Sequence, residues 1–155
     1  MFLANDSIER RHTKIRSFLP REPIIAILLA AVDFEWTVRR AIIALGTNSN
    51  RLIRDEVLNR SHGADDYKDA WKKEVKGRLG KGLPEVVPDW KFLKEEAFLL
   101  RHQVIHGVRG MPSSKKTHKC VEAFLGASQA IGSYAYSNHS PLFGKRLSVR
   151  RQPRK

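Results

Sequence analysis

One long segment without a helix-breaking residue most constrains the fold of this chain. Residues 24–45 contain neither glycine nor proline, whereas Pro23 stands just before them and Gly46 just after them. Pro23 belongs to a break before the segment and Gly46 stands at the C-cap position, so residues 24–45 are predicted to form one long helix. Its first half, residues 24–32, is apolar on every side, which predicts a buried central helix in a bundle.

The rest of the chain shows helical periodicity. Apolar residues recur at steps of three and four over residues 67–79, 89–106 and 113–136, and shorter helices are expected over residues 6–19 and 48–58. No segment shows the sustained alternation of apolar and polar residues that is typical of a strand. We therefore predict an all-α fold, a bundle of five or six helices.

The length of 155 residues indicates one domain. Glycines and prolines concentrate in residues 77–88, which are expected to form a flexible connection. The last residues, 144–155, carry basic side chains and no acidic one. We therefore predict a single helical domain over residues 1–143, followed by a basic mobile tail over residues 144–155.

Lysine and arginine number 29 against 16 aspartate and glutamate, a formal net charge of +13. Such an excess favours polyanions: nucleic acid first, an acidic protein second and an anionic membrane surface third. The side chains expected to contact an RNA backbone are Lys68, Lys72, Lys73, Lys76 and Arg109. Solubility accounts for the lysine-rich face equally well.

Cys120 is the only cysteine, so an internal disulfide and a cysteine zinc cluster are both excluded. This fits a reducing compartment, and we expect a cytoplasmic protein. The longest apolar run, residues 24–32, has nine residues, whereas a membrane span needs about 20. No membrane partner is expected.

The run from Arg101 to His106, followed at once by Gly107, holds the most promising chemistry in the chain. Arginine presents a planar fork that matches two phosphate oxygens, and histidine exchanges protons near neutral pH. Because RNA supplies its own nucleophile, the 2′-hydroxyl, a ribonuclease without metal needs only a cation and acid–base groups. We therefore expect no cofactor.

The geometry of an ideal helix separates these groups. Arg101 and His106 lie about 140° apart around the helix axis, whereas His102 and His106 share a face. Convergence therefore requires either a second subunit or a helix end unwound at Gly107.

The same run is compatible with two different roles. The side chains could form a solvated face, or His102 and His106 could share a zinc ion, although Gln103 replaces the glutamate of the usual zinc motif. Outside the run, His62 lies in a polar loop and is expected to be solvated.

Arg101, the polar His102, three variable residues, His106 and Gly107 near the end of a long helix resemble the signature of the HEPN superfamily. The motif covers about seven residues, and the resemblance in helical layout covers most of the chain. It implies a HEPN-like bundle that forms a homodimer in which two such motifs meet. It also implies that His106 acts as general acid or base, that Arg101 holds the phosphate, and that His102 is the polar companion.

The family often adds an acidic residue from an earlier helix. Glu35 is the preferred candidate and Asp33 the second, although Glu35 could instead pair with Arg39, one turn further along the same helix.

The resemblance implies a metal-independent endoribonuclease that cleaves RNA by 2′-hydroxyl attack. Such enzymes act in toxin–antitoxin, abortive-infection and phage-defence systems, so an antitoxin or another acidic protein is the expected partner. The second hypothesis is a non-catalytic helical module that binds nucleic acid or an acidic protein.

Overall fold

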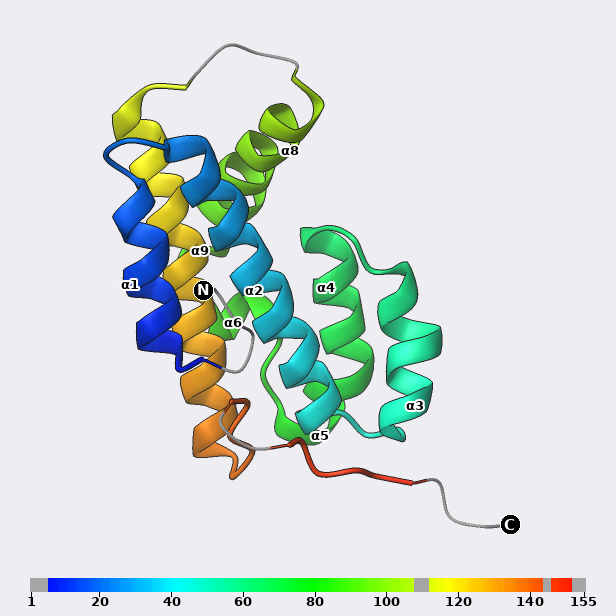
Figure 1. The fold of residues 1–155 in the computed structure, drawn as a ribbon. Helices are drawn as coiled ribbons and strands as arrows, with labels where there is room; N and C mark the ends of the chain where they lie inside the picture. Colours follow the sequence, from blue (N-terminus) through cyan, green and yellow to red (C-terminus); the bar gives the residue numbers. More distant parts are fainter. Residues whose placement is uncertain (1–5, 108–111, 144–145, 152–155) are drawn as a thin grey trace.

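The computed structural model describes residues 6–107, 112–143 and 146–151. Every regular element within these ranges is helical, which confirms the all-α prediction. The central helix is α2 (Pro23–Leu45), against which α1 (Ile8–Phe18) and α9 (Ser114–Ser137) pack along much of their length (Figure 1).

The remaining elements join into longer helices separated by short turns. The first of these longer helices consists of α3 (Asn50–Leu52), η1 (Ile53–Val57) and η2 (Leu58–Arg60). The second consists of α4 (Ala64–Trp71), η3 (Lys72–Lys76) and α5 (Gly77–Leu79). The third consists of α7 (Trp90–Phe92), η4 (Leu93–Ala97) and α8 (Phe98–His106). The one-turn α6 (Leu83–Val86) stands alone. Within the described residues these make seven helices, one more than the five or six predicted, and the additional one is α6.

The predicted end of the long helix is confirmed, and its start lies one residue earlier than predicted. Pro23 is the first residue of α2, and Gly46 follows its last residue, with the Gly46 amide donating to the Ile42 carbonyl. A Cβ at Gly46 would lie 2.5 Å from both the Ile42 carbonyl oxygen and the Ile53 side chain. Close packing, rather than a left-handed backbone, therefore requires glycine at this position.

Four aromatic rings form the centre of the core. Phe34 of α2 makes edge contacts with Tyr67 of α4 and Phe98 of α8, at centroid distances of 6.2 and 5.6 Å. Phe124 of α9 closes the cluster, 5.2 Å from Phe98. Edge-to-face rings contribute about 0.5–1.5 kcal/mol beyond their burial. The cluster holds α8 at a defined position against α2, which matters because the candidate site lies on these two helices.

The apolar start of α2 is only partly covered. Ala26, Ile27 and Ala30 are fully buried, whereas Ile24 and Ile25 are 36% and 37% exposed. Among the described residues, no helix combines the length and apolar character needed to cross a membrane.

Residues 77–88, expected to be a flexible connection, are packed. The indole nitrogen of Trp71 donates to the Lys81 carbonyl at 3.0 Å, and Leu83 is fully buried. The Gly82 amide donates to Glu85 at 2.6 Å, which caps α6. Gly80, with φ +83°, supplies the reversal after α5. The glycines and prolines therefore shape a tight turn against the core.

The basic tail has an anchor. The guanidinium of Arg150 donates to the carbonyls of Ile43, Ala44 and Asn48 at 2.5, 2.8 and 3.3 Å. Arg78 donates to the neighbouring Leu45 carbonyl. Two cations thus satisfy carbonyls at the negative end of α2. The mobility of the tail stays a prediction; residues 144–145 and 152–155 lie outside the described residues.

Candidate functional site

The structure brings Arg101 and Glu35 together. Nη2 of Arg101 lies 3.2 Å from Oε1 of Glu35, and the two side chains are 29% and 21% exposed. Each follows an aromatic residue of the core cluster, since Glu35 is next to Phe34 and Arg101 lies one turn after Phe98. The predicted acidic partner from an earlier helix therefore reaches the Arg101 side chain, because the aromatic contact sets α2 beside α8.

Glu35 is held in a mixed environment. Burial raises the pKa of its carboxyl, while the nearby charges of Arg101, Arg39 and His62 act in the opposite direction without cancelling the effect of burial. A carboxylate that is partly desolvated favours a strong cationic partner, and Arg101 provides it. Arginine has five N–H donors, so pairing with one oxygen leaves others able to face a ligand.

Arg39 does not form the intrahelical pair with Glu35 that was the alternative. Its guanidinium donates to the Tyr67 hydroxyl at 3.0 Å, the Leu58 carbonyl at 3.0 Å and the Ser61 carbonyl at 2.6 Å. Arg39 thus fastens the loop before α4 onto α2.

His102 and His106 share a face of α8, as predicted. Their ring centroids lie 4.4 Å apart, the rings are tilted by 51°, and both side chains are exposed. The helix stays regular through His106 and ends at Gly107, whose left-handed φ of +62° makes it the C-cap. An unwound helix end therefore does not bring His106 to Arg101 within one chain.

A groove of about 530 Å³ lies between the start of α4 and the η4–α8 helix; we name it the α4–α8 groove. The polar and charged side chains in its lining are His62, Asp65, Asp66, Lys94, Glu95, Arg101 and His102. His106 does not line the groove, but its ring contacts the ring of His102, which does. Lys94 is already paired with Asp65, and Asp66 and Glu95 add negative charge to the lining. Arg101 and the two imidazoles are therefore the groups suited to hold a phosphate and move protons around it.

His62 is the site residue that the sequence did not predict. It is exposed in the loop before α4, as expected, and it also lines the same groove as Arg101 and His102. No spacing in the sequence links the loop before α4 to α8. The two meet only because the Phe34 cluster packs both elements against α2.

The predicted RNA-contacting lysines lie along the continuous helix that starts at the groove. Lys72, Lys73 and Lys76 are exposed, and Lys76 lies 4.0 Å from Glu85. Lys68 is half-buried and pairs with Asp65 of the groove at 3.1 Å. Arg109, the fifth predicted contact, lies outside the described residues.

Asp33, the second candidate for the acidic residue, lies away from Arg101 in a buried ionic cluster. It accepts from Nε of Arg11 at 2.5 Å and lies 3.1 Å from Nε2 of His12. Burial alone would raise its pKa, but the hydrogen bonds from His12 and Arg11 outweigh burial and lower it. This cluster joins α1 to α2, and the Asp33 side chain is fully buried.

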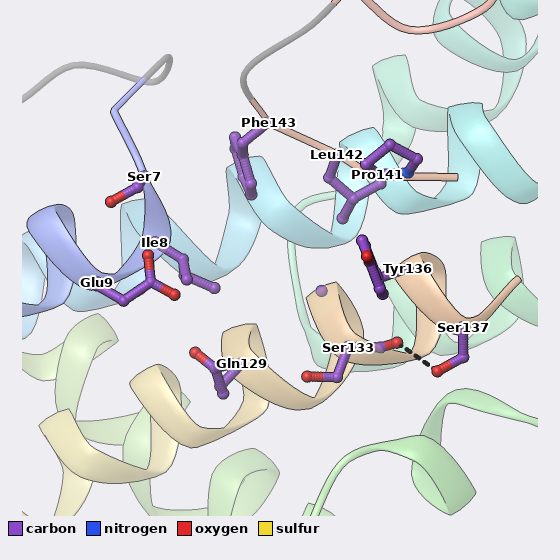
Figure 2. Close-up of a pocket in the computed structure, with 11 residues that line it drawn as sticks. Ser7, Ile8, Glu9, Gln129, Ser133, Tyr136, Ser137, Pro141, Leu142 and Phe143 are labelled. Atoms are coloured by element: carbon purple, nitrogen blue, oxygen red, sulfur yellow. Dashed lines mark hydrogen bonds between the residues drawn. The ribbon is translucent and has the colours of Figure 1, made fainter. Parts of the chain in front are cut away.

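A second cavity, about 540 Å³, lies between α1, the end of α9 and residues 141–143. Figure 2 shows Tyr136 and Phe143 at its edges, with Glu9 and Gln129 on the helices that form its walls. Among the residues that the structure describes, its lining contains no lysine, arginine or histidine. It therefore lacks the cations that a phosphate ligand requires, and it includes none of the predicted site residues.

Within the described residues, no three histidine, cysteine or acidic side chains are grouped closely enough to hold a metal ion. The thiol of Cys120 is buried in the core, and burial raises its pKa to about 11. Thiolate chemistry at neutral pH is therefore not available to it.

Comparison of the chain with protein-family models, curated proteins and solved structures finds no match. The resemblance to the HEPN superfamily stays a prediction based on the motif and its place on the helix.

Proposed function

We propose that this protein is an endoribonuclease that cleaves RNA without a metal ion. One observation carries the proposal: Arg101, held by Glu35 at 3.2 Å, faces a groove that it shares with histidines and Lys94. The groove therefore combines a permanent cation for the phosphate with groups that exchange protons near neutral pH.

The reaction requires few parts. A neutral imidazole removes the proton from the 2′-hydroxyl, the 2′-oxygen bonds to phosphorus, and the bond to the 5′-oxygen breaks. A protonated imidazole supplies the proton to that leaving oxygen. Arg101 stabilises the charge on the phosphate, Glu35 orients Arg101, and His106 is one of the proton-transfer groups, with His102 stacked beside it. The products carry a 2′,3′-cyclic phosphate and a 5′-hydroxyl.

The face of α8 that carries the histidines supports a homodimer. Leu99 and Ile105 flank His102 and His106 on this face, and they are 47% and 48% exposed. Exposed aliphatic side chains beside reactive imidazoles favour coverage by a second protein surface. A second copy would bring its own His106 towards Arg101, which overcomes the separation of the two side chains around one helix.

The HEPN-like layout extends this proposal to a biological role. Toxin–antitoxin, abortive-infection or phage-defence systems suit such a nuclease, with an antitoxin or acidic protein as a controlling partner in the cytoplasm. The exposed Lys72, Lys73 and Lys76 would hold the RNA backbone as it leaves the groove.

The test uses purified wild-type protein and His106→Ala with a mixed RNA pool in excess EDTA. His118→Ala is the matched control, because His118 is exposed on α9 and does not line the groove. We expect the wild type and the control to leave 2′,3′-cyclic phosphate ends, and His106→Ala to be inactive.

Products with 3′-hydroxyl ends, or equal cleavage by all three proteins, would contradict the proposal. RNA binding without cleavage by any of them would instead favour the non-catalytic nucleic-acid-binding module.

A further inference from the structure

We infer that His62 is a second proton-transfer group of the α4–α8 groove. His62 faces the scissile phosphate from the α4 side of the groove, and the histidines of α8 face it from the α8 side. The juxtaposition that carries this inference is the shared lining of the groove by His62, Arg101 and His102. The inference rests on the proposed ribonuclease function, and it names a residue that the Arg101–His106 motif does not include.

The loop that carries His62 is fixed on both sides. Arg39 donates to the carbonyls of Leu58 and Ser61, and the Ser61 side chain donates to the Val57 carbonyl at 3.0 Å. The backbone amide of His62 donates to Oδ2 of Asp66 at 3.0 Å. These bonds hold the His62 backbone at the mouth of the groove, while its side chain is exposed there. Such placement reduces the conformational freedom that an imidazole must lose before it can transfer a proton.

Arg39 links this loop to the phosphate anchor. It lies one turn after Glu35 on α2, and Glu35 pairs with Arg101. Helix α2 therefore positions Arg101 through Glu35, and it positions the loop that carries His62 through Arg39.

Charged groups of both signs face His62. Those of the four surrounding elements are Asp65 and Asp66 of α4, Lys94 and Glu95 of η4, Arg101 and His102 of α8, and Glu35 and Arg39 of α2. Lys94 pairs with Asp65 at 2.9 Å, and Arg101 pairs with Glu35, so much of this charge is already compensated. Among the described residues His62 therefore lies among partly compensated charges rather than beside one unpaired charge.

The chemistry needs two imidazoles in opposite states. Cleavage requires one proton to leave the 2′-hydroxyl and one to reach the 5′-oxygen, on opposite sides of the phosphorus. His102 lines one side of the groove, and the ring of His106 contacts it on the same helix face. His62 supplies the opposite side, so that one wall accepts the proton and the other donates it. After cleavage, the imidazole that began neutral is protonated, and the imidazole that began protonated is neutral.

The test compares His62→Gln with His118→Gln, since glutamine keeps polarity but does not titrate. Single-turnover cleavage is measured from pH 5 to pH 9. We expect a bell-shaped profile for the wild type and the control. We expect His62→Gln to lose about 10²-fold in rate and one limb of the bell, with KM changed less than about threefold.

A uniform fall at every pH, with both limbs kept, would show that His62 only positions the loop and would overturn the inference. An unchanged rate would overturn it as well, while leaving the ribonuclease proposal standing.

A second measurement distinguishes failure of this inference from failure of the proposed function. Inorganic phosphate is titrated into protein with ¹³C-labelled histidine, and the ring resonances are followed by NMR. We expect phosphate to shift the resonances of His62 and His102 together and to leave His118 unchanged. If the wild type cleaves no RNA, the proposed function and the proton-transfer role of His62 both fail. In that case a joint shift of the two resonances would show only that the groove binds phosphate. No shift would overturn phosphate binding by the groove as well.

Discussion

Two carboxylates of α2, only two residues apart, form opposite kinds of ion pair. Asp33 is fully buried between Arg11 and His12, and its pKa is lowered. Glu35 is paired with Arg101 at the edge of the α4–α8 groove, is 21% exposed, and has a raised pKa. The difference arises because Asp33 accepts hydrogen bonds from two basic side chains, whereas the Glu35 carboxylate, within the described residues, accepts one from Arg101 and is otherwise affected only by more distant charges.

This comparison separates a structural ion pair from one that is available for chemistry. The buried cluster satisfies most of its hydrogen-bonding groups within the protein, although Nη2 of Arg11 has no partner among the described residues. The Phe143 ring lies 3.9 Å from the Arg11 guanidinium and covers it. Arg101 is 29% exposed and keeps donors that can face a ligand. Four predictions test this difference, from the largest effect to the smallest.

The largest effect is expected for Arg101→Ala. Removal of the phosphate anchor should reduce cleavage by about 10²–10³-fold, the typical effect of losing one donor that stabilises transition-state charge. The measurement is kcat/KM on a short RNA, with circular dichroism to verify the fold. Arg101→Lys is the matched variant, and it should recover only part of the rate because lysine lacks the planar fork. Full activity of Arg101→Ala would show that Arg101 does not take part in cleavage.

Asp33→Ala should affect stability instead. It leaves Arg11 and His12 buried without their carboxylate, which should lower the free energy of unfolding by about 3–5 kcal/mol. Urea unfolding measures this, and Asp65→Ala, which breaks two exposed pairs with Lys68 and Lys94, should cost about 1 kcal/mol or less. Similar losses in the two variants would show that the Asp33 cluster has no special structural role.

The two carboxylates should also respond oppositely to pH. The lowered pKa of Asp33 gives stability that is present above its unfolded value, about 3.9, and is lost as pH falls through the folded value. The raised pKa of Glu35 means that its ionisation opposes folding above the folded value, and that protonation relieves this cost as pH falls.

Glu35→Gln should therefore change stability at pH 7 by less than about 1 kcal/mol, and the difference from wild type should shrink towards pH 4. Because Arg101 loses its orienting partner, cleavage should fall by about tenfold, within the range for supporting residues around a site. Urea unfolding at several pH values and kcat/KM measure the two effects. If Glu35→Gln lowered the free energy of unfolding by several kcal/mol, Glu35 would be a structural group like Asp33.

The smallest effect is expected for the lysines near the groove. Lys72→Gln and Lys73→Gln should each weaken RNA binding by a few fold and reduce the salt dependence of log K by about one unit or less. Fluorescence anisotropy at several salt concentrations measures both quantities. Lys14→Gln, on α1, is the control and should change neither quantity. An equal effect of this variant would indicate that net charge, and not a defined RNA path, determines binding.

Much of the fold followed from local pattern. The long helix was predicted over residues 24–45 and forms over Pro23–Leu45, because glycine and apolar repeats act within a few residues of the chain. The shared face of His102 and His106 was predicted for the same reason, since helix geometry alone sets it. The packed turn around α6 was not, because its order comes from Trp71 and Leu83, which contact other parts of the fold.

The sequence by itself determined the all-α class, the helix that carries the Arg101–His106 run and the basic character of the protein, since all three depend on local spacing or on composition. Only the tertiary structure decided that Glu35 pairs with Arg101 while Asp33 is buried with Arg11, and that His62 lines the same groove as His102. The physical reason is that contacts between residues far apart in sequence depend on how helices pack, and here the ring of Phe34 packs against both α4 and α8.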